Sequence, residues 1–286
     1  MRPIIIAICI LASLFPALAP NAHAQTDLPG MSSNETQDIK NITLPKPDFM
    51  ELKEDLGDRV TEIIDPLTIR LEQKGLSRLV GLDIPDFSPY DQGPLAQSVL
   101  LILNDMLKGK QVRLFQTSEP DKGRTNRMNQ KLYHVVIDEN ENWVQGVLVR
   151  LGLARVRSER SNPAMIRDLY KLEEEARAEK LGLWAFDQYK VLTPDEAESK
   201  INSFQIIEGT VTSSARQSSN IYINFGADWR TDFTITIKPS DARGFYKGNL
   251  DPLSLNGKKI RVRGWVNSYN GPTIEIDHPE RLEIVE

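Results

Sequence analysis

Apolar and polar residues follow two different patterns along this 286-residue chain. Between residues 62 and 187, short alternating runs typical of strands are mixed with stretches in which apolar residues return every three or four positions. Those stretches predict three helices, which begin near Pro94, Trp143 and Asn162. Asn162 suits a helix N-cap, and Pro94 and Pro163 suit the first helical position. The pattern indicates a domain of mixed α and β structure.

Residues 205–286 show a more regular alternation and predict a second domain that is mainly β. A turn at Asn270-Gly271-Pro272 separates the last two strands, and a short helix is expected at 241–246. Five short strands with one inserted helix favour a small barrel of the OB type. The expected strands are 206–211, 221–225, 233–237, 260–266 and 273–276.

The segment between the two domains, residues 188–204, is polar and predicts a linker. Thr193-Pro194-Asp195 within it is typical of a capped helix start, so a short helix from Thr193 is expected. No repeat at solenoid periods is present.

The N-terminal segment has the features of an export signal. Arg2 is followed by an apolar run and by the small residues Ala22-His23-Ala24, so residues 1–24 predict a signal peptide and a mature chain that begins at Gln25. We therefore expect a protein exported to the periplasm or secreted, with a polar leader at 25–61. The apolar run is short for a membrane anchor, and no membrane attachment is expected after cleavage. Because the single cysteine, Cys9, lies in the signal, no disulfide is expected.

Charge argues against a protein that grips nucleic acid mainly through phosphates. The 65–187 segment carries 18 basic and 18 acidic residues, and the 205–286 segment carries 10 of each. Proteins that bind nucleic acid electrostatically usually have a basic surplus. Nucleic acid is thus a candidate partner that the charge balance does not support, and a protein partner is the other candidate.

A concentrated group of charged residues stands at the end of an apolar strand. Arg78 begins the run Leu79-Val80-Gly81-Leu82, and Asp83 and Asp86 flank Pro85 after it. Proline ends strand pairing and forces a turn, so one cation and two carboxylates are displayed at a strand end. Such groups can bind phosphate or a divalent cation.

Three segments follow one another along the chain: 78–86 (RLVGLDIPD), 147–156 (VLVRLGLARV) and 174–184 (EEARAEKLGLW). In this order they resemble the thermonuclease family of micrococcal-nuclease-like domains. The resemblance spans about residues 62–187 and implies an OB-type barrel of five strands with three helices. It also implies descent from a calcium-dependent phosphodiesterase that acts on DNA and RNA.

The resemblance carries three functional positions over to this chain. Arg78 matches the first of two arginines that stabilise the phosphate, and Asp83 matches one of two aspartates that hold calcium. Asp86 stands where the family has a glutamate that acts on the attacking water, and its side chain is one methylene shorter. The resemblance thus places Arg78 and Asp86 in catalysis and Asp83 in metal binding.

The other two positions depart from the family pattern. Leu67 stands at the first calcium aspartate and Gln130 at the second arginine. Asp65, Arg127 or Lys131 would have to substitute if the site were active, although lysine lacks the bidentate fork of arginine. Losing one transition-state donor costs on the order of 10²–10³ in rate.

Two hypotheses of different class follow. The preferred one is an exported binding or scaffold protein with a degenerate nuclease site, with little or no activity and no required cofactor. The alternative is an active calcium-dependent endonuclease for single-stranded DNA or RNA with a rearranged site. Arg78 and Asp83 could also be retained only as a salt bridge that supports folding.

The remaining polar and aromatic residues predict no second active site. His134 and His278 lie in different domains and are too few for a zinc site. Glu173-Glu174-Glu175 is interpreted as the solvated face of a helix. In the second domain, aromatic residues mixed with a cation could stack bases, but we favour a core-filling role for Phe225 and Trp265. That set comprises Tyr222, Phe225, Trp229, Arg230, Trp265 and Tyr269.

Overall fold

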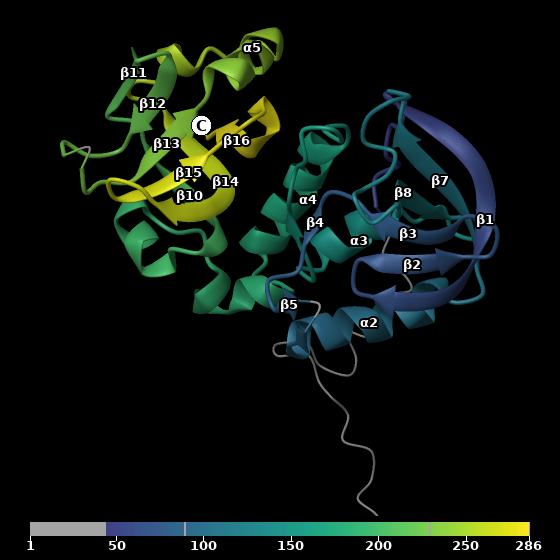
Figure 1. The fold of residues 1–286 in the computed structure, drawn as a ribbon. Coiled ribbons are helices and arrows are strands. Elements are labelled where there is room, and N and C mark those ends of the chain that lie inside the picture. Colours follow the sequence, from purple (N-terminus) through teal and green to yellow (C-terminus); the bar gives the residue numbers. More distant parts are fainter. Residues whose placement is uncertain (1–43, 89, 229, 286) are drawn as a thin grey trace, which may run out of the picture.

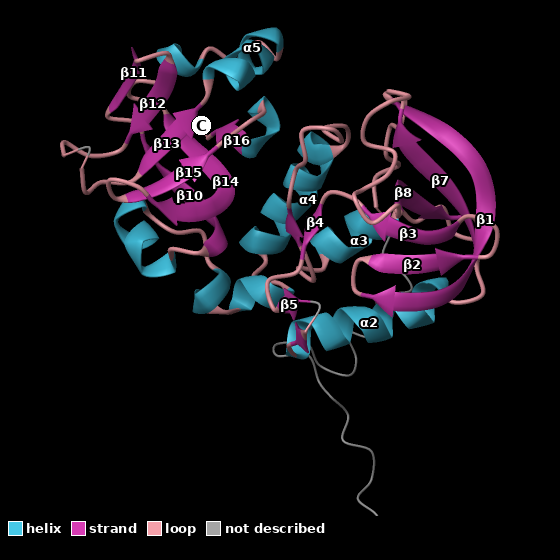
Figure 2. Ribbon diagram, in the orientation of Figure 1, coloured by secondary structure: helices cyan, strands magenta, loops and turns pink. Residues whose placement is uncertain are grey.

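The computed structural model describes residues 44–88, 90–228 and 230–285. It is a mixed α+β structure with two domains that lie side by side (Figure 1), the first drawn in purple to teal and the second in green to yellow. Strands form the centre of each domain, and helix α4 (Ile166–Ala178) lies between the two (Figure 2). The predicted signal peptide and the leader up to residue 43 lie outside the described residues.

The first domain is built on a closed barrel of five strands in the order β1-β2-β3-β8-β7. All neighbouring strands are antiparallel except β3 and β8, which are parallel. The closed barrel confirms the OB-type fold that the sequence predicts. The strands are β1 (Leu52–Asp65), β2 (Thr68–Leu71), β3 (Gly75–Leu79), β7 (Gln111–Thr117) and β8 (Lys131–Ile137).

The barrel begins inside the segment predicted as a polar leader, because β1 starts at Leu52. Its first half, which includes Lys53, Glu54 and Asp55, is largely solvent-facing and therefore lacks the apolar alternation that marks a strand. The pairing of β1 with β7 also shifts register between Asp55 and Asp58, which breaks the period of two.

Three helices pack around this barrel, in agreement with the sequence: α2 (Pro94–Leu107), α3 (Val144–Arg150) and α4. The start of α4 was predicted wrongly. Met165, in the left-handed region, precedes the helix, and the Asn162 side chain instead donates to the Gly123 carbonyl at 2.9 Å. Asn162 therefore holds a loop rather than a helix N-terminus. The 3₁₀ turns η2 (Gly182–Ala185) and η3 (Asp187–Tyr189) follow α4.

Two small strand pairs lie outside the barrel and position the candidate site. β4 (Leu82–Asp83) pairs with β9 (Arg155–Val156), and β5 (Phe87–Ser88) pairs with β6 (Asp91–Gln92). Gly81, at φ 83°, adopts the left-handed backbone between β3 and β4. The chain thus turns out of the barrel directly after Arg78-Leu79.

Residues 188–204, which the sequence predicts as a linker, contain a short helix and contact the second domain. The helix is the 3₁₀ helix η4 (Pro194–Lys200), and Thr193 caps it in a capping box with Glu196, as the sequence predicts. Leu192 and Ala197 belong to the core of the second domain. The predicted linker therefore packs with the second domain from Leu192 onward, while Tyr189 and Val191 before it pack against the first core.

The second domain is a single curled sheet in the order β10-β14-β15-β13-β12-β11, with β16 paired to β14. Its end strands, β10 and β11, follow each other in the chain. The backbone between them continues both pairings, because Val211 N–H donates to Lys258 and Thr212 N–H donates to Asn224. The strands are β10 (Ser203–Thr210), β11 (Ser213–Gln217), β12 (Asn220–Asn224), β13 (Thr234–Ile237), β14 (Lys259–Ser268), β15 (Pro272–Glu275) and β16 (Leu282–Ile284).

If β10 and β11 are counted as one bent strand, this order matches that of the first barrel, including the one parallel pair, β13 with β15. Helix α5 (Pro239–Lys247) lies between the third and fourth strands, as expected. The arrangement fits the predicted OB-like topology. The sequence missed β11, which is polar and exposed, and β16. The 3₁₀ turns η5 (Pro252–Ser254) and η6 (Pro279–Arg281) complete the domain.

Each domain has its own hydrophobic core. Phe225 packs on Phe233 beside the second core, as the core-filling interpretation expects. Trp265 contradicts that interpretation, because it is 50% exposed. The reason is its position on β14, where it alternates with the buried Val266 and so faces outward.

Within the described residues, no helix has both the length and the apolar character needed to cross a membrane.

Candidate functional site

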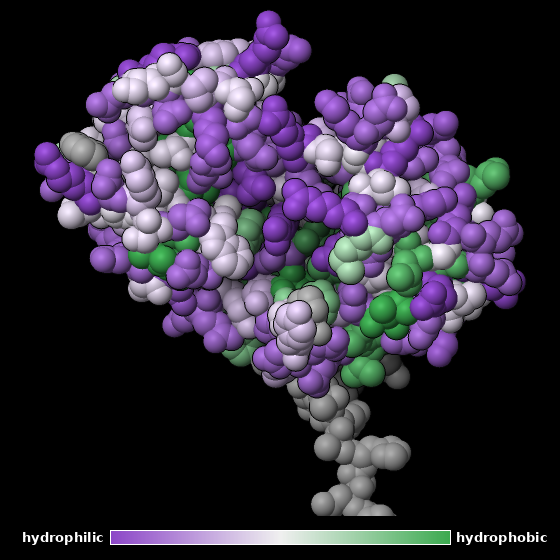
Figure 3. Space-filling view, in the orientation of Figure 1, coloured by the Kyte–Doolittle hydropathy of each residue, from purple (hydrophilic) through white to green (hydrophobic). Residues whose placement is uncertain are grey.

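The candidate site is a cleft of about 600 Å³ beside the open end of the first barrel, where β3 continues into β4. It brings together Arg78, Asp83, Leu67 and Gln130, which are distant in the sequence, and also contains Asp65. Its lining mixes polar and apolar side chains, and the face drawn in Figure 3 shows hydrophobic surface in the hollow between the two lobes. The other lining residues used below are Asn126, Arg157 and Glu159.

Arg78 is held in the cleft by the barrel itself. It lies on β3 opposite Thr68 of β2, and its Nη1 donates to Thr68 Oγ1 at 3.3 Å. Among the described residues it forms no ion pair with a carboxylate. Its guanidinium therefore retains donors for a ligand in the cleft.

Asp83 differs from Arg78, because a cation of the protein itself, Arg155, already binds its carboxylate. Oδ2 accepts from Arg155 Nη2 at 2.7 Å and from Arg155 Nε at 3.1 Å, and Arg157 lies 3.7 Å from Oδ1. Both Asp83 and Arg155 are largely buried. The retained-salt-bridge interpretation thus describes the contacts of Asp83, although the partner is Arg155 and not Arg78.

Arg155 also reaches the second domain. Its Nη2 donates to the Phe204 carbonyl at 3.2 Å, and its guanidinium lies 5.3 Å from the centre of the Phe204 ring. Arg157 lies over the same ring at 5.4 Å. The position that the resemblance assigns to calcium is therefore part of a connection between the domains.

Leu67 and Gln130 are structural. Leu67 is buried in the first core. The Gln130 side chain accepts from Asn126 Nδ2 at 2.6 Å, and Asn126 Oδ1 accepts from the Gln130 backbone N–H at 3.0 Å. These bonds close the loop that leads into β8. Arg127 and Lys131, the suggested substitutes for the second arginine, are not among the residues that line the cleft, whereas Asp65 is.

Asp86 lies outside the Arg78 cleft and caps helix α2. Its Oδ2 accepts from the Leu95 N–H at 2.8 Å and its Oδ1 from the Ala96 N–H at 2.9 Å, while its carbonyl accepts from Gly93. Both carboxylate oxygens are thus directed to the first turn of the helix, where a negative charge is stabilising. This geometry does not direct Asp86 toward a water near Arg78.

Replacing Asp86 by alanine is expected to destabilise the protein by about 1–2 kcal/mol, because two helical N–H groups lose their acceptor. Asp86→Asn is an intermediate case, since its one amide oxygen can accept from one of the two N–H groups while its NH2 faces the other donor, so its stability should lie between those of the parent and Asp86→Ala. Thermal unfolding of both variants measures the difference. Equal stability of Asp86→Ala and the parent would contradict the capping role.

Calcium does not fit the donors in this cleft. Ca²⁺ takes six to eight oxygen ligands, mostly from carboxylates and carbonyls. Here Leu67 offers no side-chain oxygen, Asp83 is bound by Arg155, and one Asp65 oxygen accepts from the Leu67 N–H at 2.8 Å. Over the described part of the chain, no group of three or more His, Cys, Asp or Glu residues is arranged to hold a metal ion.

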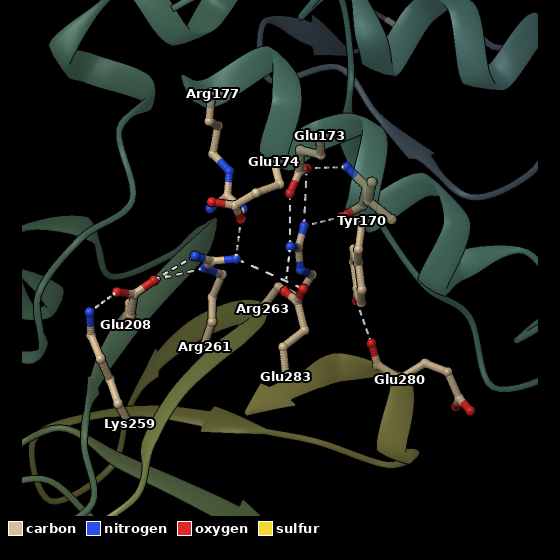
Figure 4. A network of polar contacts seen from close by, with 11 residues as sticks. Tyr170, Glu173, Glu174, Arg177, Glu208, Lys259, Arg261, Arg263, Glu280 and Glu283 are labelled. Atoms are coloured by element: carbon tan, nitrogen blue, oxygen red, sulfur yellow. Dashed lines mark hydrogen bonds and ion pairs between the residues drawn. The ribbon is translucent and has the colours of Figure 1, made fainter. Parts of the chain in front are cut away.

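The sequence interpretation missed a polar network between the domains, which is shown in Figure 4. Glu173 of α4 is completely buried and pairs with Arg263 of β14 at 2.8 Å, whose guanidinium stacks 4.0 Å from the Tyr170 ring centre. Glu173 also accepts from the Val156 N–H at 2.7 Å. The prediction of a solvated glutamate face was therefore wrong for Glu173, because the second domain packs on that face.

A second arginine extends the network. Arg261 of β14 contacts Glu208 at 2.7 Å, Glu174 of α4 at 3.0 Å and Glu283 at 3.8 Å. Burial raises the pKa of Glu208, but hydrogen bonds and charge from Lys259 and Arg261 outweigh it and hold that pKa below its ordinary value. The sequence signal was that Arg261 and Arg263 alternate on a predicted strand, while Glu173, Glu174 and Glu175 form a run of negative charge in another part of the chain.

The domain interface also contains a Ser–His–Asp arrangement. His278 Nε2 lies 2.9 Å from Ser158 Oγ, and its Nδ1 lies 2.7 Å from Asp277 Oδ1. The hydrogen bond from His278 lowers the pKa of Asp277 to about 2. Ser158 is only 2% exposed, so a substrate carbonyl has no access to its hydroxyl. We interpret the set as a hydrogen-bonded link between the domains.

The comparison with protein families agrees with the barrel and the helices. Residues 77–186 match the family model described as staphylococcal nuclease homologue. The chain therefore contains a staphylococcal-nuclease-like domain with a nuclease-type fold, followed by the second domain. No curated protein matches the chain.

Proposed function

We propose that this is an exported binding or scaffold protein, in which the nuclease-type site has been converted into a support for the second domain. The observation that carries the proposal is the carboxylate of Asp83, which is paired with Arg155, while Arg155 donates to the Phe204 carbonyl of the other domain. Arg155 occupies Oδ2 of Asp83, and Arg157 lies 3.7 Å from Oδ1, so two cations already neutralise the carboxylate that calcium would have to bind. The loss of side-chain oxygen at Leu67 and of a cation at Gln130 supports the same conclusion.

The alternative function, a calcium-dependent endonuclease, is favoured by one observation. Arg78 lines the cleft without a carboxylate partner in the described residues and lies in the same cleft as Asp65. A single cation can still bind a phosphate. Hydrolysis would need a second cation and an acceptor for the proton of water, and the residues that line the cleft include Arg157 and Glu159.

The deciding experiment is hydrolysis of heat-denatured DNA by residues 25–286, with calcium and with chelator. We expect no calcium-dependent cutting above that of an Arg78→Ala preparation, which controls for contaminating nucleases. Calcium-dependent cutting that disappears in Arg78→Ala would contradict the proposal and establish the alternative. Gel electrophoresis of the products measures both outcomes.

Export is tested separately. The full chain, expressed in a bacterium and recovered from the periplasm or the medium, is expected to begin at Gln25. Mass spectrometry of the intact protein measures this. A chain that keeps residues 1–24 and remains with the cytoplasm would contradict export without affecting the hydrolysis experiment.

A further inference from the structure

Arg78 and Asp65 line the same cleft from the two strands on either side of β2. Thr68 of β2 is the strand partner of Asp65 on β1 and also of Arg78 on β3. Each charged side chain makes one described hydrogen bond, from Arg78 to Thr68 Oγ1 and from the Leu67 N–H to Asp65. Among the described residues, neither belongs to an ion pair. The cleft therefore contains a cation and an anion that are both available to a ligand.

The strand register limits the distance between these two charges. Paired Cα atoms on antiparallel strands are separated by about 4.5–5.5 Å, so the backbone of Asp65 lies about 5 Å from that of Thr68. The guanidinium of Arg78 is held at the Thr68 side chain, with Nη1 3.3 Å from Oγ1. The charged ends of Arg78 and Asp65 are therefore separated by a gap on the order of 10 Å or less, which a small molecule with both charges can bridge.

Exposed apolar side chains border the same cleft. Ile64, next to Asp65 on β1, is 37% exposed, and Met128, in the loop before β8, is 77% exposed. The hydrophobic core leaves both of these large side chains partly uncovered. Methionine adapts to apolar ligands, because its side chain is unbranched and flexible. A ligand with an apolar group beside its charges therefore fits the cleft.

The charges of the cleft disfavour a polyanion. Arg157 lies 3.7 Å from the Asp83 carboxylate, so its charge is already partly neutralised. Among the described lining residues, Arg78 is then the only cation without a carboxylate partner, whereas Asp65 and Glu159 add two negative charges. These carboxylates would repel the successive phosphates of a nucleic acid. A ligand with one negative and one positive charge matches the cleft better.

We propose that this cleft binds an apolar amino acid or its dipeptide in the zwitterionic form. Arg78 donates charge-assisted hydrogen bonds to the ligand carboxylate, and Asp65 accepts from the ligand ammonium. Ile64 and Met128 contact the apolar side chain of the ligand. The cleft volume of about 600 Å³ is in the usual range for small-molecule sites. This inference rests on the proposed function, because it supplies a ligand for the site of a binding protein.

Isothermal titration calorimetry of residues 25–286 with L-leucine and with Leu-Leu, in chelator, tests the proposal. We expect at least one of the two to bind, and the two titrations distinguish the free amino acid from the dipeptide. Arg78→Ala and Asp65→Asn should each weaken binding about tenfold or more, because each removes a charge-assisted hydrogen bond. Arg70→Ala is the matched control, because Arg70 is an exposed arginine of β2 that pairs with Glu62 and does not line the cleft.

Blocked forms of the ligand that binds assign each charge to its residue. The N-acetylated form lacks the ammonium, so it should bind the parent about tenfold or more weakly and lose nothing further in Asp65→Asn. The C-terminal amide lacks the carboxylate and should be equally insensitive to Arg78→Ala. A purely structural role of either residue would instead weaken the binding of all forms alike.

Three outcomes would overturn the proposal. They are binding of neither zwitterion, equal affinity of the parent and both cleft variants, and binding of a single-stranded thymidine oligonucleotide but of neither zwitterion. Circular dichroism of each variant establishes that it is folded. Calcium-dependent cutting of DNA would contradict the proposed function, whereas absence of zwitterion binding without such cutting would contradict only this ligand, so the two failures are distinguishable.

Discussion

Replacing Arg263 by methionine is expected to destabilise the folded protein by about 3–5 kcal/mol, because a completely buried carboxylate would lose its cation. Arg263 is 1% exposed and Glu173 is 0% exposed, so water cannot replace the lost partner. Glu283 also contacts Arg263, at 2.7 Å, and would lose that contact as well. Urea unfolding, followed by circular dichroism, measures the change.

Two further variants separate the ion pair from other effects of the substitution. Arg216→Ala is the control, because Arg216 is an exposed arginine of the same domain whose side chain contacts only the Tyr246 hydroxyl among the bonds described. It should cost less than about 0.5 kcal/mol. Adding Glu173→Gln to Arg263→Met should restore part of the stability, since glutamine is uncharged and still accepts from the Val156 N–H. A double variant that is less stable than Arg263→Met would contradict this account.

The Glu173–Arg263 pair also predicts how the free energy of unfolding changes with pH. Burial raises the pKa of Glu173, but the charge and hydrogen bond of Arg263 outweigh burial, so the pKa lies below its ordinary value of 4.5. A lowered pKa means that Glu173 stabilises the fold above about pH 4.5 and that this contribution is lost as the pH falls through its folded-state pKa. In Arg263→Met, burial without the cation should raise the pKa of Glu173. The stability difference between parent and variant should therefore narrow from pH 7 to pH 4.

The second large effect is expected for Asp83→Ala, which should destabilise the protein by about 3 kcal/mol. The substitution leaves the Arg155 guanidinium buried with only the Phe204 carbonyl and ring as partners. Asp65→Asn is the matched control, since Asp65 lines the same cleft and its one described bond, from the Leu67 N–H, is one that asparagine can keep. Its effect should remain below about 1 kcal/mol.

Asp83→Ala also distinguishes the two functions. If Asp83 supports the domain contact, the variant loses stability with or without calcium. If Asp83 is a metal ligand, calcium should stabilise the parent and not the variant, because a ligand that binds only the native state raises its stability. Urea unfolding with calcium and with chelator measures both. A variant as stable as the parent in chelator would contradict the structural role.

The elements of the fold follow closely from local sequence. Helix α2 begins at Pro94, and the alternation in 205–286 locates β12, β13 and β15 to within a residue or two. These positions are predictable because burial of one face imposes a period of 3.6 or 2 on the side chains. Strand β1 was missed, because charged residues such as Lys53 and Glu54 occupy its solvent-facing first half and a register shift between Asp55 and Asp58 breaks the period of two.

The candidate site around Arg78 was only partly predictable, because the sequence does not show which partner each carboxylate binds. The sequence identified Arg78, Asp83, Leu67 and Gln130 as one group, and the structure places all four around one cleft. It also grouped Asp86 with them, because Asp86 is close in sequence. Instead, both carboxylate oxygens of Asp86 accept hydrogen bonds from the backbone N–H groups of Leu95 and Ala96 in helix α2. Proximity along the chain does not show which donor a carboxylate will meet.

The sequence by itself determined the three helices of the first domain, most strands of the second, the nuclease-type first domain and the absence of a disulfide, since each depends on local pattern or on residue identity. Only the tertiary structure decided the partners of the charged groups. Glu173 is buried and Glu175 is exposed although they are two residues apart, because the second domain packs against one and not the other. Arg155 likewise binds Asp83 across 72 positions. Such pairings depend on how distant segments pack, within the first domain for Arg155 with Asp83 and between the domains for Glu173 with Arg263, and no local period records that.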